Sequence, residues 1–429
     1  MSFNQGLSGL NGASKNLDVI GNNIANTSTV GFKASRAEFS DVYAASINGV
    51  SNLNVGIGTK TAAVVQQFTQ GNISVTNNPL DLAISGDGFF QLVQTDPNSP
   101  TATTGLTTFT RNGQFQMDKN GYIVDNAGRK LIGFPATEGV VIPGTLQPIK
   151  VSLGVAKPNP TSTAQIIANL DSTSTAPTGA AFGAATPATA INPATPSTYN
   201  YSTTFTVYDT PGSPLGLTLY FQKAGAGWNV AGYVGGNQVL PVGDATVAGT
   251  ETAMTLAFAA DGTVATINGA AVAPLTTTAA GTMPSFSLDL SLLTQYGSTS
   301  GVSFVSQDGY STGKFVSLSV DKTGLVQGRY TNGQALAIGQ ILMTNFLNPN
   351  GLQPLGDNQW GETTAAGKQS SEAPGTGVLG YLQSGVVEES NVDLTAELVN
   401  MIVAQRMYQA NAQTVKTQDS ILQTLVNLR

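Results

Sequence analysis

Apolar residues recur every seven positions at both ends of the chain. One stripe begins at Phe3, and a longer one runs through residues 392–429, which contain neither Gly nor Pro. A seven-residue apolar repeat is typical of helices that pack along a narrow seam, so both ends are expected to be helical. The residues expected to pack in these seams are Phe3, Leu10, Leu17, Ile20, Ile24, Leu394, Leu398, Met401, Ile402, Tyr408, Val415, Leu422 and Leu425.

The N-terminal stripe is interrupted by Gly6, Gly9, Gly12 and Gly21. Each Gly in a helix interior costs about 1 kcal/mol relative to Ala. The N-terminal helix is therefore expected to depend on packing for its stability. Matching stripes at the two ends favour a helical domain in which the ends pack on each other and on copies of themselves.

Between the ends, the pattern changes to that of β-strands. Residues 109–124 alternate apolar and polar side chains around two Asn-Gly pairs, which predict a double hairpin. A similar phrase recurs at residues 318–326. From residue 158 to residue 313 the only positive charge is Lys223, and this shift in composition indicates a separate, weakly acidic domain.

These patterns predict a multidomain, mainly β protein with a terminal α-helical coiled-coil domain formed by both chain ends. Two β-rich domains are expected, one inserted in the other. The expected boundaries are 1–28 and 390–429 for the helical core domain, 29–75 and 370–389 for a linker region, 76–148 and 297–369 for the inner β domain, and 149–296 for the inserted outer β domain.

The composition excludes several classes of function. The 429 residues include no His and no Cys, which rules out zinc sites built from these residues and every Ser-His or Cys-His nucleophile pair. A net charge of −7 argues against nucleic-acid binding, which needs a basic face. No stretch approaches the roughly 18 apolar residues of a membrane span, and no cleavable signal is visible. We expect no cofactor, no metal, no nucleic acid and no membrane insertion.

Two short motifs are expected to be structural. Residues 309–313 match G-x-S-x-G, but the chain has no His to accept the proton of Ser311, so a turn is expected there. Residues 375–380 match G-x-G-x-x-G without a preceding strand, which favours a loop. No catalytic residue is predicted. A β-rich glycosidase with a pair of carboxylates and a surface adhesin remain as alternatives, although neither explains the terminal stripes.

Residues 22–33 contain the most distinctive pattern in the chain. The signature residues are Asn22, Asn23, Asn26, Gly31, Phe32 and Lys33, and they resemble the N-terminal signature of the bacterial flagellar rod and hook proteins. Residues 384–394 and 401–411 resemble the C-terminal region of the same family, and residues 85–90 and 120–122 are further shared marks.

The resemblance implies a structural subunit that is not an enzyme. Members of this family stack into a hollow helical tube with terminal helices lining the channel. The inserted domain favours a hook-type subunit, part of a flexible universal joint that transmits torque from rod to filament; a distal rod component is the alternative. The implied partners are copies of the chain, the distal rod protein, the hook cap, the hook–filament junction proteins and the flagellar export apparatus. The implied location is the extracellular hook and basal body, after export without a cleaved signal peptide.

Overall fold

The computed structural model describes residues 2–42, 56, 58–94, 105–152, 154–177, 191, 193–240 and 254–427. It divides into two compact units. The first comprises Met1–Leu153, Val316–Arg329 and Ala335–Arg429, and the second comprises Gly154–Phe315 and Tyr330–Gln334. Each unit has its own sheets, and the two are described separately below.

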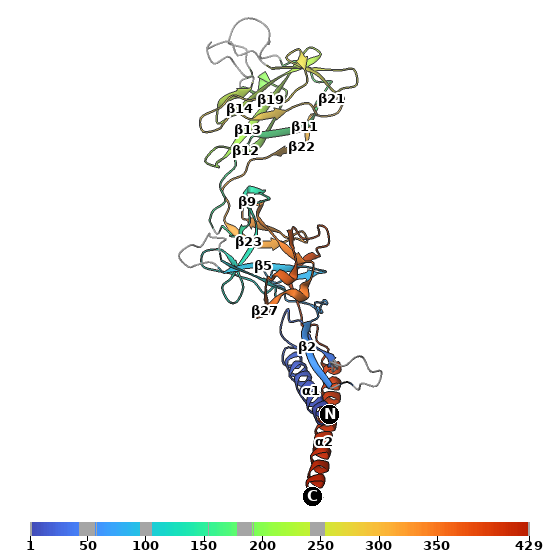
Figure 1. The fold of residues 1–429 in the computed structure, drawn as a ribbon. Coiled ribbons are helices and arrows are strands. Elements are labelled where there is room, and N and C mark those ends of the chain that lie inside the picture. Colours follow the sequence, from blue (N-terminus) through green and yellow to red (C-terminus); the bar gives the residue numbers. More distant parts are fainter. Residues whose placement is uncertain are drawn as a thin grey trace. The chain divides into compact units, whose positions relative to one another are not determined.

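The chain ends form two helices, α1 (Ser2–Ala25) and α2 (Leu394–Asn427), which lie side by side (Figure 1). Asp393 caps α2, because its Oδ1 accepts hydrogen bonds from the backbone N–H groups of Thr395 at 2.8 Å and Ala396 at 3.2 Å. An antiparallel hairpin, β1 (Ser35–Val42) and β2 (Gly58–Gln66), packs against α1.

The rest of the first unit is built from β-strands. Its largest sheet has the order β23-β24-β25-β9-β5-β6-β28-β27, with shorter strands pairing beside it. The strands are β3 (Ile73–Val75), β4 (Leu82–Ser85), β5 (Phe89–Gln94), β6 (Leu106–Thr110), β7 (Gln116–Met117), β8 (Ile123–Val124), β9 (Lys130–Val141), β10 (Gln147–Pro148), β23 (Phe315–Val320), β24 (Leu325–Tyr330), β25 (Ala335–Ile341), β26 (Met343–Phe346), β27 (Gln353–Gly356), β28 (Gln359–Gly361), β29 (Gln369–Glu372), β30 (Tyr381–Ser384) and β31 (Val386–Glu388). Two 3-10 turns also occur, η3 (Pro349–Gly351) and η4 (Thr364–Ala366).

Edge-to-face aromatic contacts form part of the core of this unit. Phe89 lies 5.6 Å from Trp360 and 6.1 Å from Phe346, measured between ring centroids, and Phe109 lies 4.8 Å from Phe346. Such pairs add about 0.5–1.5 kcal/mol beyond the burial of their area. These contacts join β5, β6, β26 and β28, so strands from both halves of the sequence share one core.

The second unit contains a seven-stranded and a five-stranded sheet. Its strands are β11 (Thr163–Asp171), β12 (Tyr201–Tyr208), β13 (Pro214–Ala224), β14 (Gly227–Val234), β15 (Asn237–Leu240), β16 (Met254–Phe258), β17 (Val264–Ile267), β18 (Ala270–Ala271), β19 (Leu275–Thr276), β20 (Ser287–Asp289), β21 (Thr294–Tyr296) and β22 (Gly301–Gln307), with one 3-10 turn, η2 (Pro196–Thr198). Every second residue of β11 is buried, as strand geometry requires, and Ile166 and Leu170 pack with Trp228 of β14 in one core.

The mainly β architecture with paired terminal helices confirms the expected fold class. The second unit extends further toward the C-terminus than the expected insertion at 149–296, because β22 pairs with β11. The four-part division of the chain stays a prediction. Residues 43–55 and 57, in the expected linker region, and residues 178–190 and 192, in the Ala/Thr/Pro-rich segment 155–200, lie outside the described residues.

Of the two hairpin turns predicted in residues 109–124, one is confirmed and the other is wrong. The turn containing Asn120 and Gly121 joins β7 to β8, which pair as expected. The segment at Asn112 and Gly113 does not join paired strands, because β6 pairs with β5 and β28 instead of β7. Gly113 lies directly against the backbone of Leu82, where no side chain fits. A glycine here therefore allows two backbone segments to approach closely and does not form a hairpin turn.

Candidate functional site

The two terminal helices approach closely through glycines of α1. A Cβ atom added to Gly6 would lie 3.0 Å from Val415 Cγ2, and one added to Gly9 would lie 2.8 Å from the Asn411 side chain. Gly12 faces the hairpin instead, with Phe39 and Thr59 as its nearest neighbours. Three of the four glycines that weaken α1 as an isolated helix, Gly6, Gly9 and Gly12, therefore lie where α2 and the hairpin pack against it.

The expected seam residues of α1 lie mostly toward its partners. Ile20 is buried, Leu10, Leu17 and Ile24 are partly buried, and Phe3 is exposed. Ala13 and Val19 are also buried. The buried side of α1 thus faces α2 and the hairpin within the same chain.

The expected seam residues of α2 divide into two groups. Met401 and Val415 are partly buried, whereas Leu394, Leu398, Ile402, Tyr408 and Leu422 are exposed. The Leu425 side chain lies outside what the structure describes. Among the described side chains of α2, Ala404 alone is fully buried. The contact with α1 therefore uses small and polar positions of α2, and most of the larger apolar residues remain uncovered.

These uncovered residues form a continuous surface on the first half of α2, which we call the apolar face. Leu394, Leu398 and Ile402 lie one helical turn apart and are 47%, 46% and 51% exposed. A neighbouring row on the same helix is made by Val399, Val403 and Met407, which are also exposed. An exposed apolar surface of this kind marks a site of interaction.

A second feature lies where the two chain ends meet the β-strands of the first unit. Gly31 has a φ angle of +72°, and a Cβ atom there would lie 2.6 Å from the backbone nitrogen of Asn112. Its N–H donates a 2.8 Å hydrogen bond to the carbonyl of Glu388. Only glycine combines this backbone conformation with this close approach, which gives Gly31 of the signature a physical role.

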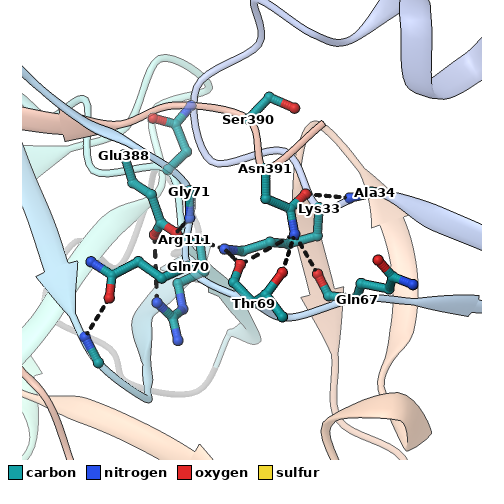
Figure 2. Close-up of polar contacts among 12 residues, drawn as sticks. Lys33, Ala34, Gln67, Thr69, Gln70, Gly71, Arg111, Glu388, Ser390 and Asn391 are labelled. Atoms are coloured by element: carbon teal, nitrogen blue, oxygen red, sulfur yellow. Dashed lines mark hydrogen bonds and ion pairs between the residues drawn. The ribbon is translucent and has the colours of Figure 1, made fainter. Parts of the chain in front are cut away.

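Two residues after Gly31, Lys33 enters a buried cluster of charges around Glu388 (Figure 2). Lys33 Nζ lies 2.6 Å from Glu388 Oε1, and Arg111 lies 3.4 Å from Glu388 Oε2. The side chains of Lys33 and Glu388 have no exposed surface, and that of Arg111 is 2% exposed. Burial lowers the pKa of Lys33 and the pKa of Arg111, and the charge of Glu388 opposes both shifts.

Two asparagines extend this network toward the helices. Asn391 Oδ1 accepts from the N–H of Ala34 at 2.7 Å, and its amide group donates to the carbonyl of Gln67 at 2.8 Å. Asn23 of α1 accepts from the N–H of Ser35 and donates to Glu397 of α2 at 3.0 Å. The residues 31–35, 67–71, 111 and 388–391 together are called the junction below.

The signature residues have different surroundings. Asn23, Gly31, Phe32 and Lys33 are buried, whereas Asn22 is exposed. Asn26 accepts a hydrogen bond from the Thr29 hydroxyl in the turn after α1. Four of the six signature residues therefore have a packing role.

Sequence reasoning did not assign a role to Glu388, Arg111 or Asn391. The sequence offers only a weak signal for them: Glu388 and Glu389 are neighbours, and nothing in that pair indicates that Glu388 is buried while Glu389 is exposed. Their roles depend on contacts between residues as far as 357 positions apart in the chain.

Comparison with known proteins gives matches along most of the chain. The model of the flagella basal body rod protein matches residues 3–33, that of the flagellar hook protein FlgE/F/G D1 domain matches 83–154, that of the flagellar basal body protein FlaE D2 domain matches 169–310, and that of the flagellar basal body rod FlgEFG protein C-terminal region matches 383–428. The chain is 40% identical to the flagellar hook proteins FlgE of Salmonella typhimurium and Escherichia coli, with the whole of each chain covered. The chain belongs to the flagellar hook protein family.

The fold agrees with this assignment. The crystal structure of the Helicobacter pylori flagellar hook protein FlgE2 matches with a TM-score of 0.53 at 14% identity, covering 73% of this chain and 100% of that chain. A more distant relative, the FlgE protein of Borreliella burgdorferi, is 30% identical over 100% of this chain and 99% of its own. The Lys33–Glu388 ion pair connects the N-terminal and C-terminal regions that the family models match.

The remaining motifs fit a structural role. The segment at residues 309–313 lies between β22 and β23, as expected for a turn, and the carbonyl of Ser311 accepts a hydrogen bond from Asn332 at 2.8 Å. Among the described residues, no group of acidic side chains is arranged to hold a metal ion. Neither helix, over its described residues, has an apolar stretch long enough to cross a membrane.

Proposed function

We propose that the chain is the structural subunit of the bacterial flagellar hook. Copies polymerise into a flexible hollow tube, which acts as a universal joint and transmits torque from rod to filament. Relatives named as flagellar hook proteins, matched along their whole length, support this function. The observation that carries the mechanism is the apolar face of α2, which the described residues of a single chain leave exposed.

The apolar face accounts energetically for self-association. Burying a large aliphatic side chain fully is worth about 1.5–3 kcal/mol. Leu394, Leu398 and Ile402 are about half exposed in the single chain. Burying the exposed part of each side chain against another copy would contribute roughly 1 kcal/mol per residue to association. A subunit that repeats this contact around an axis generates a helical polymer.

The finer assignments also belong to the proposal. The proposed partners besides copies of the chain are the distal rod protein, the hook cap, the hook–filament junction proteins and the flagellar export apparatus, and the proposed location is the extracellular hook. A distal rod component predicts no large inserted domain, whereas this chain matches a D2 domain model over residues 169–310. We propose no catalytic activity, because the chain contains no His and no Cys to act as base or nucleophile.

Electron microscopy of the purified chain tests this function. We expect the unaltered chain to form curved tubes and Leu398→Asp to prevent polymerisation, because the change places a charge in the apolar face. Gln413→Asp is the matched control, since Gln413 is an exposed polar residue of the same helix that lies beyond Met407, the last residue of the apolar face. Straight tubes would indicate a rod component instead. Normal polymers of Leu398→Asp would show that the apolar face is not the contact between subunits.

A further inference from the structure

The segment Glu388–Asn391 supplies the hydrogen-bond partners of two separate N-terminal segments. Toward the first, the Glu388 carbonyl accepts from Gly31 and the Asn391 side chain accepts from Ala34. Toward the second, Glu388 Oε1 accepts from the N–H of Gly71 at 2.9 Å, and Asn391 donates to Gln67. The two N-terminal segments also join each other, because the N–H of Gln67 donates to the carbonyl of Ala34 at 2.8 Å.

The charges at the junction make these contacts depend on Glu388. In the described part of the chain, Lys33 and Arg111 form ion pairs with Glu388 alone. Asp87 also acts on Arg111 through its charge, but Asp87 is exposed to solvent and so neutralises a buried cation poorly. Without Glu388, closing the junction would bury two cations with no buried counter-charge, which is strongly unfavourable.

We propose that Glu388–Asn391 acts as a closing strap for the N-terminal part of the chain. Residues 31–35 and 67–71 reach their folded arrangement only when the strap binds, and the decisive contribution is the negative charge of Glu388, which pairs with both Lys33 and Arg111. Because the strap lies near the opposite end of the sequence, the N-terminal segments cannot close before the C-terminal part of the chain is available. This device is a property of the single chain and does not depend on the proposed polymer.

Hydrogen–deuterium exchange on the full-length chain tests the strap in three variants. The reporters are the amides of Ala34 and Gln67, neither of which is bonded to the Glu388 side chain. With Glu388→Ala, we expect both reporters to exchange at least about a hundredfold faster, because a buried ion pair loses its only anion. With the control Glu389→Ala, which removes an exposed carboxylate, exchange changes less than about twofold.

The third variant separates neutralisation from simple loss of contact. Lys33→Met leaves one buried cation, Arg111, paired with one buried anion, Glu388, so no cation is left without its counter-charge, and we expect an increase of less than about tenfold. The proposal is overturned if Lys33→Met affects the reporters as much as Glu388→Ala does, or if Glu388→Ala leaves them unchanged. Amides of β5 and β9 in the first unit show in the same experiment whether the sheet next to the junction remains folded in each variant.

Refolding of the unaltered chain supplies a second measurement. The amide of Glu389 donates to the carbonyl of Asn72 at 2.8 Å, so its protection reports that the strap has bound. Pulsed exchange during refolding is expected to show protection at Ala34 and Gln67 at the same time as, or later than, protection at Glu389. Earlier protection of Gln67, whose amide donates to the carbonyl of Ala34 and not to the strap, would show that the N-terminal segments close without the strap.

Discussion

Gly9 and Asn411 determine how closely the two terminal helices approach each other. The Asn411 side chain occupies the space where a Cβ atom of residue 9 would lie, at 2.8 Å. Ala is a better helix former than Gly by about 1 kcal/mol, so an unopposed Gly9→Ala change would stabilise α1. The clash with Asn411 works in the opposite direction, and overpacking of this kind typically costs about 1–3 kcal/mol.

We therefore predict that Gly9→Ala destabilises the packing of α1 on α2 by about 1 kcal/mol or more. Hydrogen exchange of α1 amides in the assembled polymer measures the effect, with Gly21→Ala as the control because a Cβ atom at Gly21 meets no neighbour. The double variant Gly9→Ala/Asn411→Ala removes the clash and is expected to restore slow exchange. Slower exchange in Gly9→Ala alone would mean that Asn411 moves aside without penalty.

At the residue scale, local roles could be predicted from the sequence and distant ones could not. The sequences Asp-Lys-x-Gly that begin at Asp118 and Asp321 each form the turn between two paired strands. In each turn the Asp carboxylate accepts hydrogen bonds from the backbone N–H groups two and four residues ahead. These bonds are local, so the sequence phrase is sufficient to predict them. The burial of Lys33 depends on its ion pair with Glu388, and no local sequence pattern around either residue predicts that contact.

At the scale of elements, the seven-residue spacing predicted both helices, and the predicted stretch 392–429 contains α2 (Leu394–Asn427). The spacing did not show which side of α2 packs on α1. The strongly apolar positions are left exposed, and the contact uses Ala404, Asn411 and Val415. Asn411 and Val415 lie against Gly9 and Gly6, so the fit of side chains to the glycines of α1 helps to select this contact.

The exposure of α2 leads to a prediction about the free subunit. Isolated helices are marginal in water, and α2 gains little from burial within one chain, since Ala404 is its one fully buried described side chain. We predict that amides between Leu394 and Leu422 exchange rapidly in the monomer and become protected in the polymer. Hydrogen exchange on both forms measures this difference. Strong protection in a verified monomer would show that α2 is stable without neighbouring subunits.

For the whole molecule, the sequence predicted a mainly β chain with a nested domain, and the shift in charge composition indicated roughly where that domain lies. The C-terminal limit was the least predictable part, because β22 joins the second unit by pairing with β11, more than 100 residues earlier in the sequence. Pairing over this separation depends on contacts between distant residues, which the residues of β22 alone do not predict.

The chain enters and leaves the second unit at neighbouring positions. Ala156 and Gly313 pair as an isolated antiparallel bridge, with a 2.8 Å hydrogen bond from the N–H of Ala156 to the carbonyl of Gly313. The buried core of the second unit lies entirely between Ala164 and Leu293, with Val302 and Val305 packed against it. An insert that closes on itself and contains its own core is expected to fold independently.

We predict that a chain lacking residues 157–312, with Ala156 joined to Gly313 through a short glycine linker, retains the helices, the junction and the apolar face. It should still form tubes, since Leu394, Leu398 and Ile402 are untouched, although their curvature is expected to differ. Electron microscopy gives the result, and exchange of β5 and β9 amides confirms that the remaining sheet is folded. Residues 157–312 expressed alone should unfold cooperatively on heating. A shortened chain that is folded but forms no polymer would show that contacts of the second unit are required to build the tube.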